Sequence, residues 1–236
     1  MATRTGRSQR RTEALSRERI VEAAVELLDT AGEGGLTFRA LTERLATGHG
    51  AIYWHVANKG ELLAAATDAV IAAALAVEPA GSAGSTGSAD STPQERVRAV
   101  ASGLFDTIDE HPWVAAQLTA SSLQVTTPRI FESVGRQVRA LGVPEGSWFT
   151  AASVLVEYIL GAAAQNAANA RALGPDANRA EFLDAVSNAW EELDPDDYPF
   201  TRAVAEQLRA HDDREQFLAG IDLVLAGITA LHPPRG

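Results

Sequence analysis

Four side chains between residues 49 and 55 have the types and spacing to contact nucleic acid: His49, Tyr53, Trp54 and His55. Tyr53 and the two histidines carry hydrogen-bonding groups, and Trp54 can place a flat apolar face against a sugar or a thymine methyl group. Each of them alone is more typical of core packing or of a solvated surface. Together, on the outer side of one short helix, they predict contact with DNA.

Two short helices joined by a tight turn are expected to position these side chains. The first begins at Thr37, whose hydroxyl can accept an orphan backbone N–H. Its apolar stripe consists of Ala40, Leu41 and Leu45. Residues 46–48 are expected to form the turn, with Gly48 free to take a positive φ. The second helix is expected over 49–55, and its inward residues are Ile52 and Val56. This arrangement is a helix-turn-helix, whose second helix fits the major groove of DNA.

The segment YWHVANK at residues 53–59 closely resembles the TetR family of one-component transcriptional regulators, in the branch of the tetracycline repressor. The resemblance runs in register from IVEAAVELLDTAGEGGLTFRAL (20–41) to YWHVANKGELLAA (53–65). A later segment, AVAEQLRAHDDREQFLAGIDLVLAGI (203–228), is similar to that branch's C-terminal dimerisation region. The resemblance implies a homodimer with a helix-turn-helix head and a ligand-binding body, acting as a repressor that a small-molecule effector releases from its operator.

The resemblance also assigns roles to residues of the head. Lys59 matches the family's phosphate-contacting lysine at a helix N-terminus, and Tyr53 and His55 match positions that hydrogen-bond phosphates. Arg39 matches a position that reaches a guanine edge, a bidentate contact worth about 1–3 kcal/mol of discrimination. Further candidates for phosphate contacts are Thr37 and Thr47. Two heads about 34–36 Å apart predict a palindromic operator.

The sequence departs from its relatives in the first turn of the second helix. His49 replaces a long amide side chain, and Gly50 and Ala51 supply little contact to bases. Ala46 stands where many relatives have the turn glycine. We therefore expect residues 49–51 to face the bases, but an operator sequence cannot be carried over from the relatives.

The charge of the chain is divided between its two ends. The net charge is −11. Residues 1–60 carry nine basic and seven acidic side chains, whereas residues 61–236 carry eleven basic and 24 acidic side chains. The acidic charge is thus kept away from the expected DNA-binding end. The chain has no cysteine, no uninterrupted apolar run of membrane-spanning length and no signal peptide pattern. These features predict a soluble cytoplasmic protein.

Helical spacing and abundant alanine predict an all-α fold in two domains. We expect a disordered basic arm at 1–15, the DNA-binding domain at 16–60, and a ligand-binding and dimerisation domain at 61–236. The arm is either a solvated tail or a source of extra DNA contacts. The Gly/Ser/Ala-rich stretch at 78–93 predicts a flexible loop. Helices are expected at 16–31, 37–45, 49–55, from 59, 94–110, from 112, 128–141, 145–171, 180–193, 200–210 and 213–231.

The larger domain contains aromatic and amide side chains that suit a mostly apolar effector pocket. The candidates are Trp113, Gln117, Phe131, Trp148, Phe149, Tyr158, Gln165, Asn166 and Trp190. Core packing is the alternative for each of them. The helix at 213–231 has no charge after Asp222, which predicts burial on several sides, in a dimer's four-helix bundle or within one chain. The candidate dimer contacts are Tyr158, Ile159, Ile221, Leu225, Ile228 and Leu231.

Catalytic patterns are not found. The sequence has no phosphate loop, no GxSxG elbow and no HExxH, so we expect no enzyme, no metal site and no cofactor beyond a small apolar or amphipathic effector. Leu75 and Ala115 fall where the tetracycline repressor has histidines for drug and magnesium, so we expect no tetracycline–metal site. Two alternatives stay open: a dimeric ligand-sequestering protein without an operator, and a transcriptional activator on the same fold.

Overall fold

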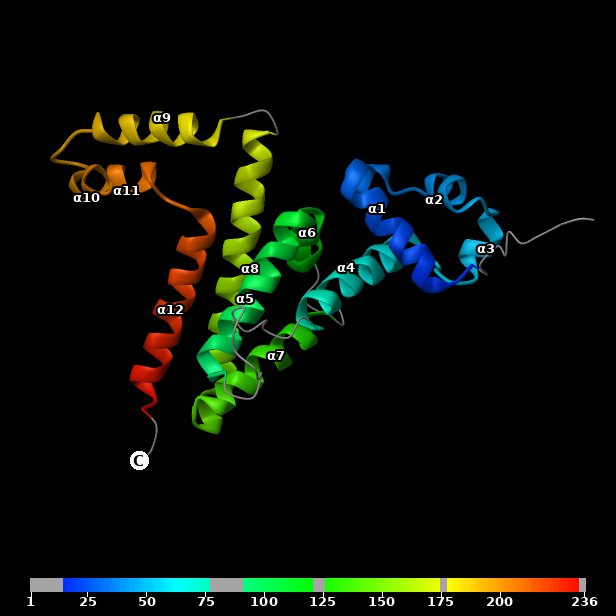
Figure 1. Cartoon of the computed structure of the whole chain (residues 1–236), viewed down its shortest axis with the longest axis horizontal. Coiled ribbons are helices and arrows are strands. Elements are labelled where there is room, and N and C mark those ends of the chain that lie inside the picture. The colour runs from blue at the N-terminus through cyan, green and yellow to red at the C-terminus, as the bar shows by residue number, and fades with distance from the viewer. Residues whose placement is uncertain (1–14, 77–90, 121–125, 175–177, 234–236) are drawn as a thin grey trace, which may run out of the picture. The chain divides into compact units, whose positions relative to one another are not determined.

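The computed structural model describes residues 15–76, 91–120, 126–174 and 178–233. Over these ranges the chain forms α-helices and one short 3-10 helix, without a strand, and the all-α prediction is confirmed (Figure 1). The expected basic arm, except for Leu15, and most of the expected loop at 78–93 lie outside the described residues.

The helices agree closely with those expected. They are α1 (Arg17–Gly35), α2 (Phe38–Leu45), α3 (His49–Tyr53), α4 (Lys59–Ala76), α5 (Pro93–Glu110), α6 (Trp113–Ala120), α7 (Thr126–Ala140), η1 (Glu145–Ser147), α8 (Trp148–Leu173), α9 (Arg179–Glu191), α10 (Pro199–Ala203), α11 (Ala205–Arg209) and α12 (Asp213–Leu231). The single helix expected at 200–210 is in fact two helices, because Val204 leaves the helical conformation with φ −102° and ψ 2°.

The chain divides into two compact units, Met1–Ala66 and Thr67–Gly236. In the first unit, α1, α2, α3 and the start of α4 enclose a small apolar core. Its fully buried side chains are Ile20, Leu28, Leu36, Leu41, Ile52, Val56 and Leu62. Two of them, Ile52 and Val56, are the residues expected to face inward from the second helix of the helix-turn-helix.

Short polar residues set several helix ends as the sequence predicts. Thr37 begins α2, because its hydroxyl accepts the Ala40 N–H at 3.1 Å. Thr92 begins α5 in a full capping box with Glu95, and Pro93 occupies the first turn. Gly32 interrupts α1 with φ +63°, a conformation that is costly for any residue with a Cβ. These local signals are readable without tertiary information.

The second unit is organised around α8. This helix packs against α5, α6, α7 and α12, and its buried side chains include Leu155, Val156 and Ile159 (Figure 1). Within the described part of the chain, one helical stretch, Glu145–Leu173, is long and apolar enough to cross a membrane by length and composition alone. In this structure that apolar length is used for helix packing on several sides.

Candidate nucleic-acid interface and effector pockets

The turn between α2 and α3 differs from its prediction. Gly48 is extended, with φ −87° and ψ 153°, and Ala46 takes the left-handed conformation instead, with φ 49° and ψ 45°. The Ala46 N–H donates to the Glu43 carbonyl at 3.4 Å and the Thr47 N–H to the Thr42 carbonyl at 3.1 Å. These two bonds form a Schellman motif, which requires positive φ at the first residue after the helix. The prediction for Gly48 was wrong because this motif ends α2 two residues earlier.

Of the four side chains predicted to face outward, His49, Tyr53 and Trp54 are exposed and His55 is half-buried. Trp54 is 89% exposed and Tyr53 52% exposed, and His49 and Gly50 are also exposed. Ile52 and Val56 anchor the opposite side in the core. The helix ends at Tyr53, so Trp54 and His55 lie in the turn that follows. The expected extension of the helix to His55 was two residues too long.

Phe38, which was not among the predicted site residues, supports this surface. Its ring stacks on that of Tyr53 with 4.6 Å between centroids and 14° between planes. Aromatic stacking fixes the direction of a side chain that a short exposed helix would otherwise leave mobile. An aromatic residue at the first position of α2 was the available signal.

Two predicted basic contacts are engaged inside the first unit. Arg39 Nε pairs with Glu43 Oε1 at 2.9 Å, and both side chains are exposed. Lys59, the single lysine of the chain, donates from Nζ to the Glu33 carbonyl at 2.6 Å. Both side chains have further N–H donors, so they can contact DNA with or without exchanging these partners. Thr37 is exposed, and its hydroxyl already caps α2.

The N-terminus of α4, where Lys59 lies, is built from three more polar residues. Asn58 Oδ1 accepts the Glu61 N–H at 2.9 Å, and Glu61 Oε2 accepts the Ala57 N–H at 2.8 Å. Arg17 pairs with the same Glu61 carboxylate at 3.1 Å. The Ala57 N–H, followed by Arg17, lowers the pKa of Glu61 below its ordinary value of 4.5. This network caps the first turn of α4 and ties it to α1.

The nine candidates for effector contact do not form one pocket. Gln165, Asn166 and Trp190 do lie together, in a pocket of about 690 Å³ between α8, α9, α10, α11 and α12. The other lining residues are Asn169, Phe200, Val204, Gln207, Leu208, His211, Asp213 and Gln216. Five of the eleven lining side chains are amides, a feature that the sequence analysis recognised only in part.

The remaining candidates have structural partners in the second unit. Trp113 is buried, Phe131 and Phe149 pack with 5.8 Å between ring centroids, and Gln117 is half-buried. The Trp148 indole N–H donates to the Val143 carbonyl at 2.7 Å. The Tyr158 hydroxyl donates to the Phe217 carbonyl at 3.2 Å, and burial raises the pKa of Tyr158. Core packing, the alternative stated for each residue, describes Trp113 and Tyr158 well.

The candidate dimer contacts need a correction of the same kind. Ile159, Ile221, Leu225 and Ile228 are buried inside the chain itself, and Tyr158 is half-buried against Phe217. Leu231 is exposed, and so is Leu223, which the sequence analysis did not select. The uncharged segment of α12 thus uses one face for its own core and leaves another face uncovered. The packing of α12 on α5 and α8 determines which face of α12 is buried and which is exposed.

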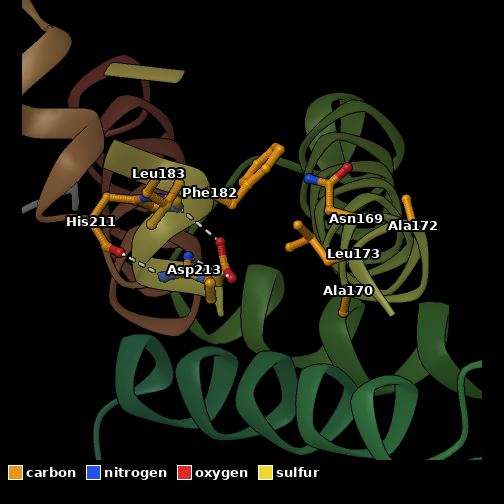
Figure 2. Close-up of a pocket in the computed structure, with 9 residues that line it drawn as sticks. Asn169, Ala170, Ala172, Leu173, Phe182, Leu183, His211 and Asp213 are labelled. Atoms are coloured by element: carbon orange, nitrogen blue, oxygen red, sulfur yellow. Dashed lines mark hydrogen bonds and ion pairs between the residues drawn. The ribbon is translucent and has the colours of Figure 1, made fainter. Parts of the chain in front are cut away.

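A second pocket of about 340 Å³ lies beside the first, at the junction of α8, α9 and α12 (Figure 2). Asn169, His211 and Asp213 line both pockets. Among the described residues, the pockets included, no group of three His, Asp or Glu side chains is arranged to hold a metal ion.

A short recognition helix with an exposed polar and aromatic surface, joined to a helical body with pockets, defines the class of helix-turn-helix regulators. Residues 20–66 match the family model "Bacterial regulatory proteins, tetR family" and residues 87–232 match "Tetracyclin repressor-like, C-terminal domain". The chain belongs to the TetR family of transcriptional regulators.

Three relatives illustrate this membership. The structure of SCO7222, described as a TetR from Streptomyces coelicolor, is 64% identical with a TM-score of 0.81, over 92% of this chain and 99% of that one. The HTH-type transcriptional repressor DrrR1 of Streptomyces coeruleorubidus is 28% identical over 94% of this chain and 80% of its own length. A structure of BioQ with its double-stranded DNA operator is 26% identical with a TM-score of 0.59, over 92% of this chain and 99% of that one.

Proposed function

We propose that this chain is a cytoplasmic one-component repressor that binds a palindromic operator as a homodimer and leaves it when a small amphipathic effector binds. The observation that carries the proposal is the exposed surface formed by His49 and Tyr53 of α3 and by Trp54 directly after it, while Ile52 and Val56 anchor this segment in the core. Membership in a family of regulators, with one repressor and one operator-bound structure among the relatives, supports it.

In this proposal each side chain of the head has a separate role. His49, Gly50 and Ala51 in the first turn of α3 face the base edges, and Arg39 exchanges Glu43 for a guanine. Tyr53, His55, Thr37 and Thr47 contact phosphates, Trp54 covers a sugar or a thymine methyl group, and Lys59 adds its charge at the N-terminus of α4. The phosphate contacts position the head and residues 49–51 select the operator.

The effector is assigned to the larger pocket. Its volume of about 690 Å³ lies in the range of small-molecule sites, and Trp190 and Phe200 provide apolar surface. The amides of Gln165, Asn166 and Gln207 can orient carbonyl or hydroxyl groups of the ligand. An effector releases the operator only if it binds the DNA-free conformation more tightly, and operator DNA must then weaken effector binding by the same factor.

The homodimer is assigned to the uncovered face of α12. Leu223 and Leu231 are 76% and 78% exposed, and small residues lie between them on the same side of the helix. These small residues are Ala226, Gly227 and Ala230. A face of this composition allows the backbone of a second helix to approach closely, which a four-helix bundle between two subunits requires.

The experiment that tests the function measures binding to duplexes from the promoter regions beside the chain's own gene, against scrambled duplexes, at low and at physiological salt. Specific binding that survives the higher salt, and that Tyr53→Ala or Trp54→Ala weakens at least tenfold, is the expected result. The matched control is Tyr198→Ala, an exposed tyrosine in the second unit. Equal, salt-sensitive binding to both kinds of duplex would reject the operator and favour a ligand-sequestering protein.

A further inference from the structure

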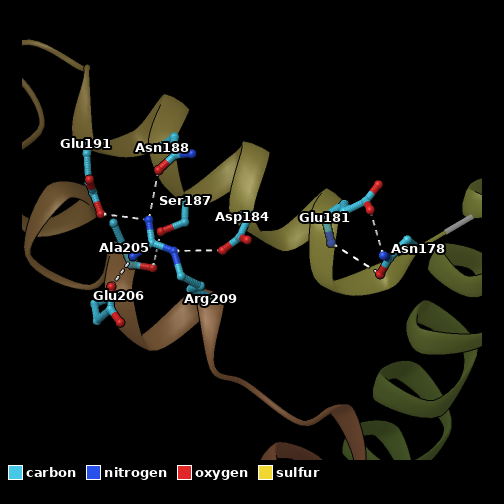
Figure 3. A network of polar contacts seen from close by, with 9 residues as sticks. All are labelled: Asn178, Glu181, Asp184, Ser187, Asn188, Glu191, Ala205, Glu206 and Arg209. Carbon is cyan, nitrogen blue, oxygen red and sulfur yellow. Dashed lines mark hydrogen bonds and ion pairs between the residues drawn. The ribbon is translucent and has the colours of Figure 1, made fainter.

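The helices α9, α10 and α11 form a small module of their own. They pack mainly against one another, and Arg209 of α11 joins this helix to α9 through Asn188 at 2.9 Å, Glu191 at 3.1 Å and Asp184 at 3.0 Å (Figure 3). The buried Ser187 hydroxyl donates to the Ala205 carbonyl at 2.7 Å. This internal bonding gives the module a set of polar contacts of its own.

The smaller pocket lies where this module meets α8 and α12. Its volume is about 340 Å³, at the lower end of the range for small-molecule sites. Its apolar lining residues are Ala170, Ala172, Leu173, Phe182 and Leu183. Figure 2 shows the ring of Phe182 projecting from α9 toward Leu173 and Asn169 of α8. The pocket is therefore bounded by an aromatic ring on one side and by aliphatic side chains on the other.

One hydrogen-bond donor points into this apolar space. Asn169 Oδ1 accepts the Gln165 Nε2 hydrogen at 2.9 Å, and its Nδ2 is directed toward Phe182 (Figure 2). An amide nitrogen in this position recognises a carbonyl oxygen. A ligand that fills the apolar part of the pocket can place a carbonyl against it.

The charges at the far wall compensate one another. Arg179 Nη2 pairs with Asp213 Oδ2 at 2.8 Å, and its Nη1 donates to the His211 carbonyl at 3.2 Å. His211 Nε2 lies 2.8 Å from the other carboxylate oxygen, Asp213 Oδ1. Because the Arg179 charge is already balanced by Asp213, the wall has no net charge to attract an ion, and a neutral ligand fits it best.

We propose that this pocket is a second ligand site, which binds a compact uncharged aromatic ketone of one or two fused rings between Phe182 and Leu173, with its carbonyl on Asn169. The volume limits the size, the apolar lining selects the rings, and the Asn169 amide selects the carbonyl. None of the lining residues belongs to the α12 face assigned to the dimer. Since the ligand would contact both α8 and α9, its binding ties the α9–α11 module to the rest of the second unit.

The test uses the full chain and the fluorescent naphthyl ketone 6-propionyl-2-(dimethylamino)naphthalene, whose emission moves to shorter wavelength in apolar surroundings. Phe182→Ala is expected to weaken binding of this probe about tenfold, since a fully used aromatic contact contributes about 1.5 kcal/mol. The matched control is Phe200→Ala, which removes an exposed phenylalanine that lines only the larger pocket and should leave the affinity within twofold.

A second pair of variants tests the proposed hydrogen bond between Asn169 and the carbonyl of the probe. A hydrogen bond to the carbonyl of the probe lengthens its emission wavelength. Asn169→Leu removes the donor and keeps an apolar side chain at this position. The probe bound to this variant should therefore emit at shorter wavelength than the probe bound to the wild-type chain. Asn166→Leu, which changes only the larger pocket, should leave the spectrum as it is. Amide exchange in α9 should slow when the probe is bound.

The proposal is overturned if the wild-type chain does not bind the probe, if Phe182→Ala and Phe200→Ala weaken binding equally, or if Asn169→Leu leaves the emission unchanged. No DNA is present in these measurements. If operator binding fails, the proposal of a second ligand site is therefore not affected. If probe binding fails, the proposed repressor function is not affected.

Discussion

Phe38 at the start of α2 and Tyr53 at the end of α3 stack with 4.6 Å between their ring centroids. The two residues belong to different helices of the helix-turn-helix, so the stack fixes the direction of Tyr53 relative to the turn. The exposed Tyr53 hydroxyl is thus positioned by a residue that has no role in DNA contact itself.

The first prediction is that Phe38→Ala weakens operator binding although Phe38 is not assigned to the DNA surface. A lost stack of about 0.5–1.5 kcal/mol in each head predicts a loss of about five- to 150-fold in a dimer. Tyr53→Phe keeps the stack and removes only the hydroxyl, so it separates positioning from phosphate contact. Fluorescence anisotropy with the operator measures both variants, and unchanged affinity of Phe38→Ala would show that Tyr53 needs no support.

The second prediction concerns the left-handed residue of the turn. Ala46 has φ 49°, which costs a residue with a Cβ about 1–2 kcal/mol. Ala46→Gly relieves this cost but increases the entropy of the unfolded chain, so a net stabilisation of about 0.5–1 kcal/mol is expected. Urea unfolding of the two proteins measures the difference. Gly48→Ala is the matched control, because Gly48 is extended and a Cβ there meets no atom within 4 Å, and it should not destabilise the protein.

Lys59 gives the third prediction, because it is the single lysine in the sequence. An amine-reactive reagent can modify only its Nζ and the α-amine of the chain. Operator DNA should protect Lys59 from modification, whereas a scrambled duplex at the same salt should protect it less. Mass spectrometry measures the modified fraction of Lys59, with the protein treated without DNA as the reference. Equal modification with and without operator would remove Lys59 from the phosphate contacts.

The fourth prediction follows from the lowered pKa of Glu61, caused first by the Ala57 N–H and then by Arg17. Because the folded pKa lies below the ordinary value of 4.5, the ionised carboxylate stabilises the fold above pH 4.5. This stabilisation is lost as the pH falls from 4.5 through the folded pKa. Glu61→Gln cannot titrate, so its unfolding free energy should fall less steeply over that acidic range than the wild type's. Parallel pH profiles would show that Glu61 makes no such contribution.

The sequence predicted local features well and tertiary ones poorly. The start of α2 at Thr37 and the inward direction of Ile52 and Val56 follow from capping and helical period, which are local. The sequence favoured Gly48 over Ala46 as the left-handed residue, because glycine is preferred there by propensity, but the hydrogen bonds that end α2 decided otherwise. The stack of Phe38 on Tyr53 depends on how α2 packs on α3, and no period within either helix encodes it.

The predicted dimer contacts on α12 depended on tertiary packing in the same way, and they lead to the last prediction. A helix that is apolar nearly all round must be covered on several sides, but its sequence does not say which face a partner covers. Ile221, Leu225 and Ile228 face the chain's own core, and Leu223 lies on the uncovered face.

We therefore expect Leu223→Arg to shift the protein from dimer to monomer, because a charge in an apolar helix interface costs several times the contribution of the leucine. Sedimentation velocity measures the mass in solution. Thermal unfolding by circular dichroism checks that the helices are retained, as expected for a residue that is 76% exposed. Gln216→Arg, on an exposed position nearer the start of α12, should remain dimeric. A Leu223→Arg protein that stays dimeric would assign the subunit interface to another surface.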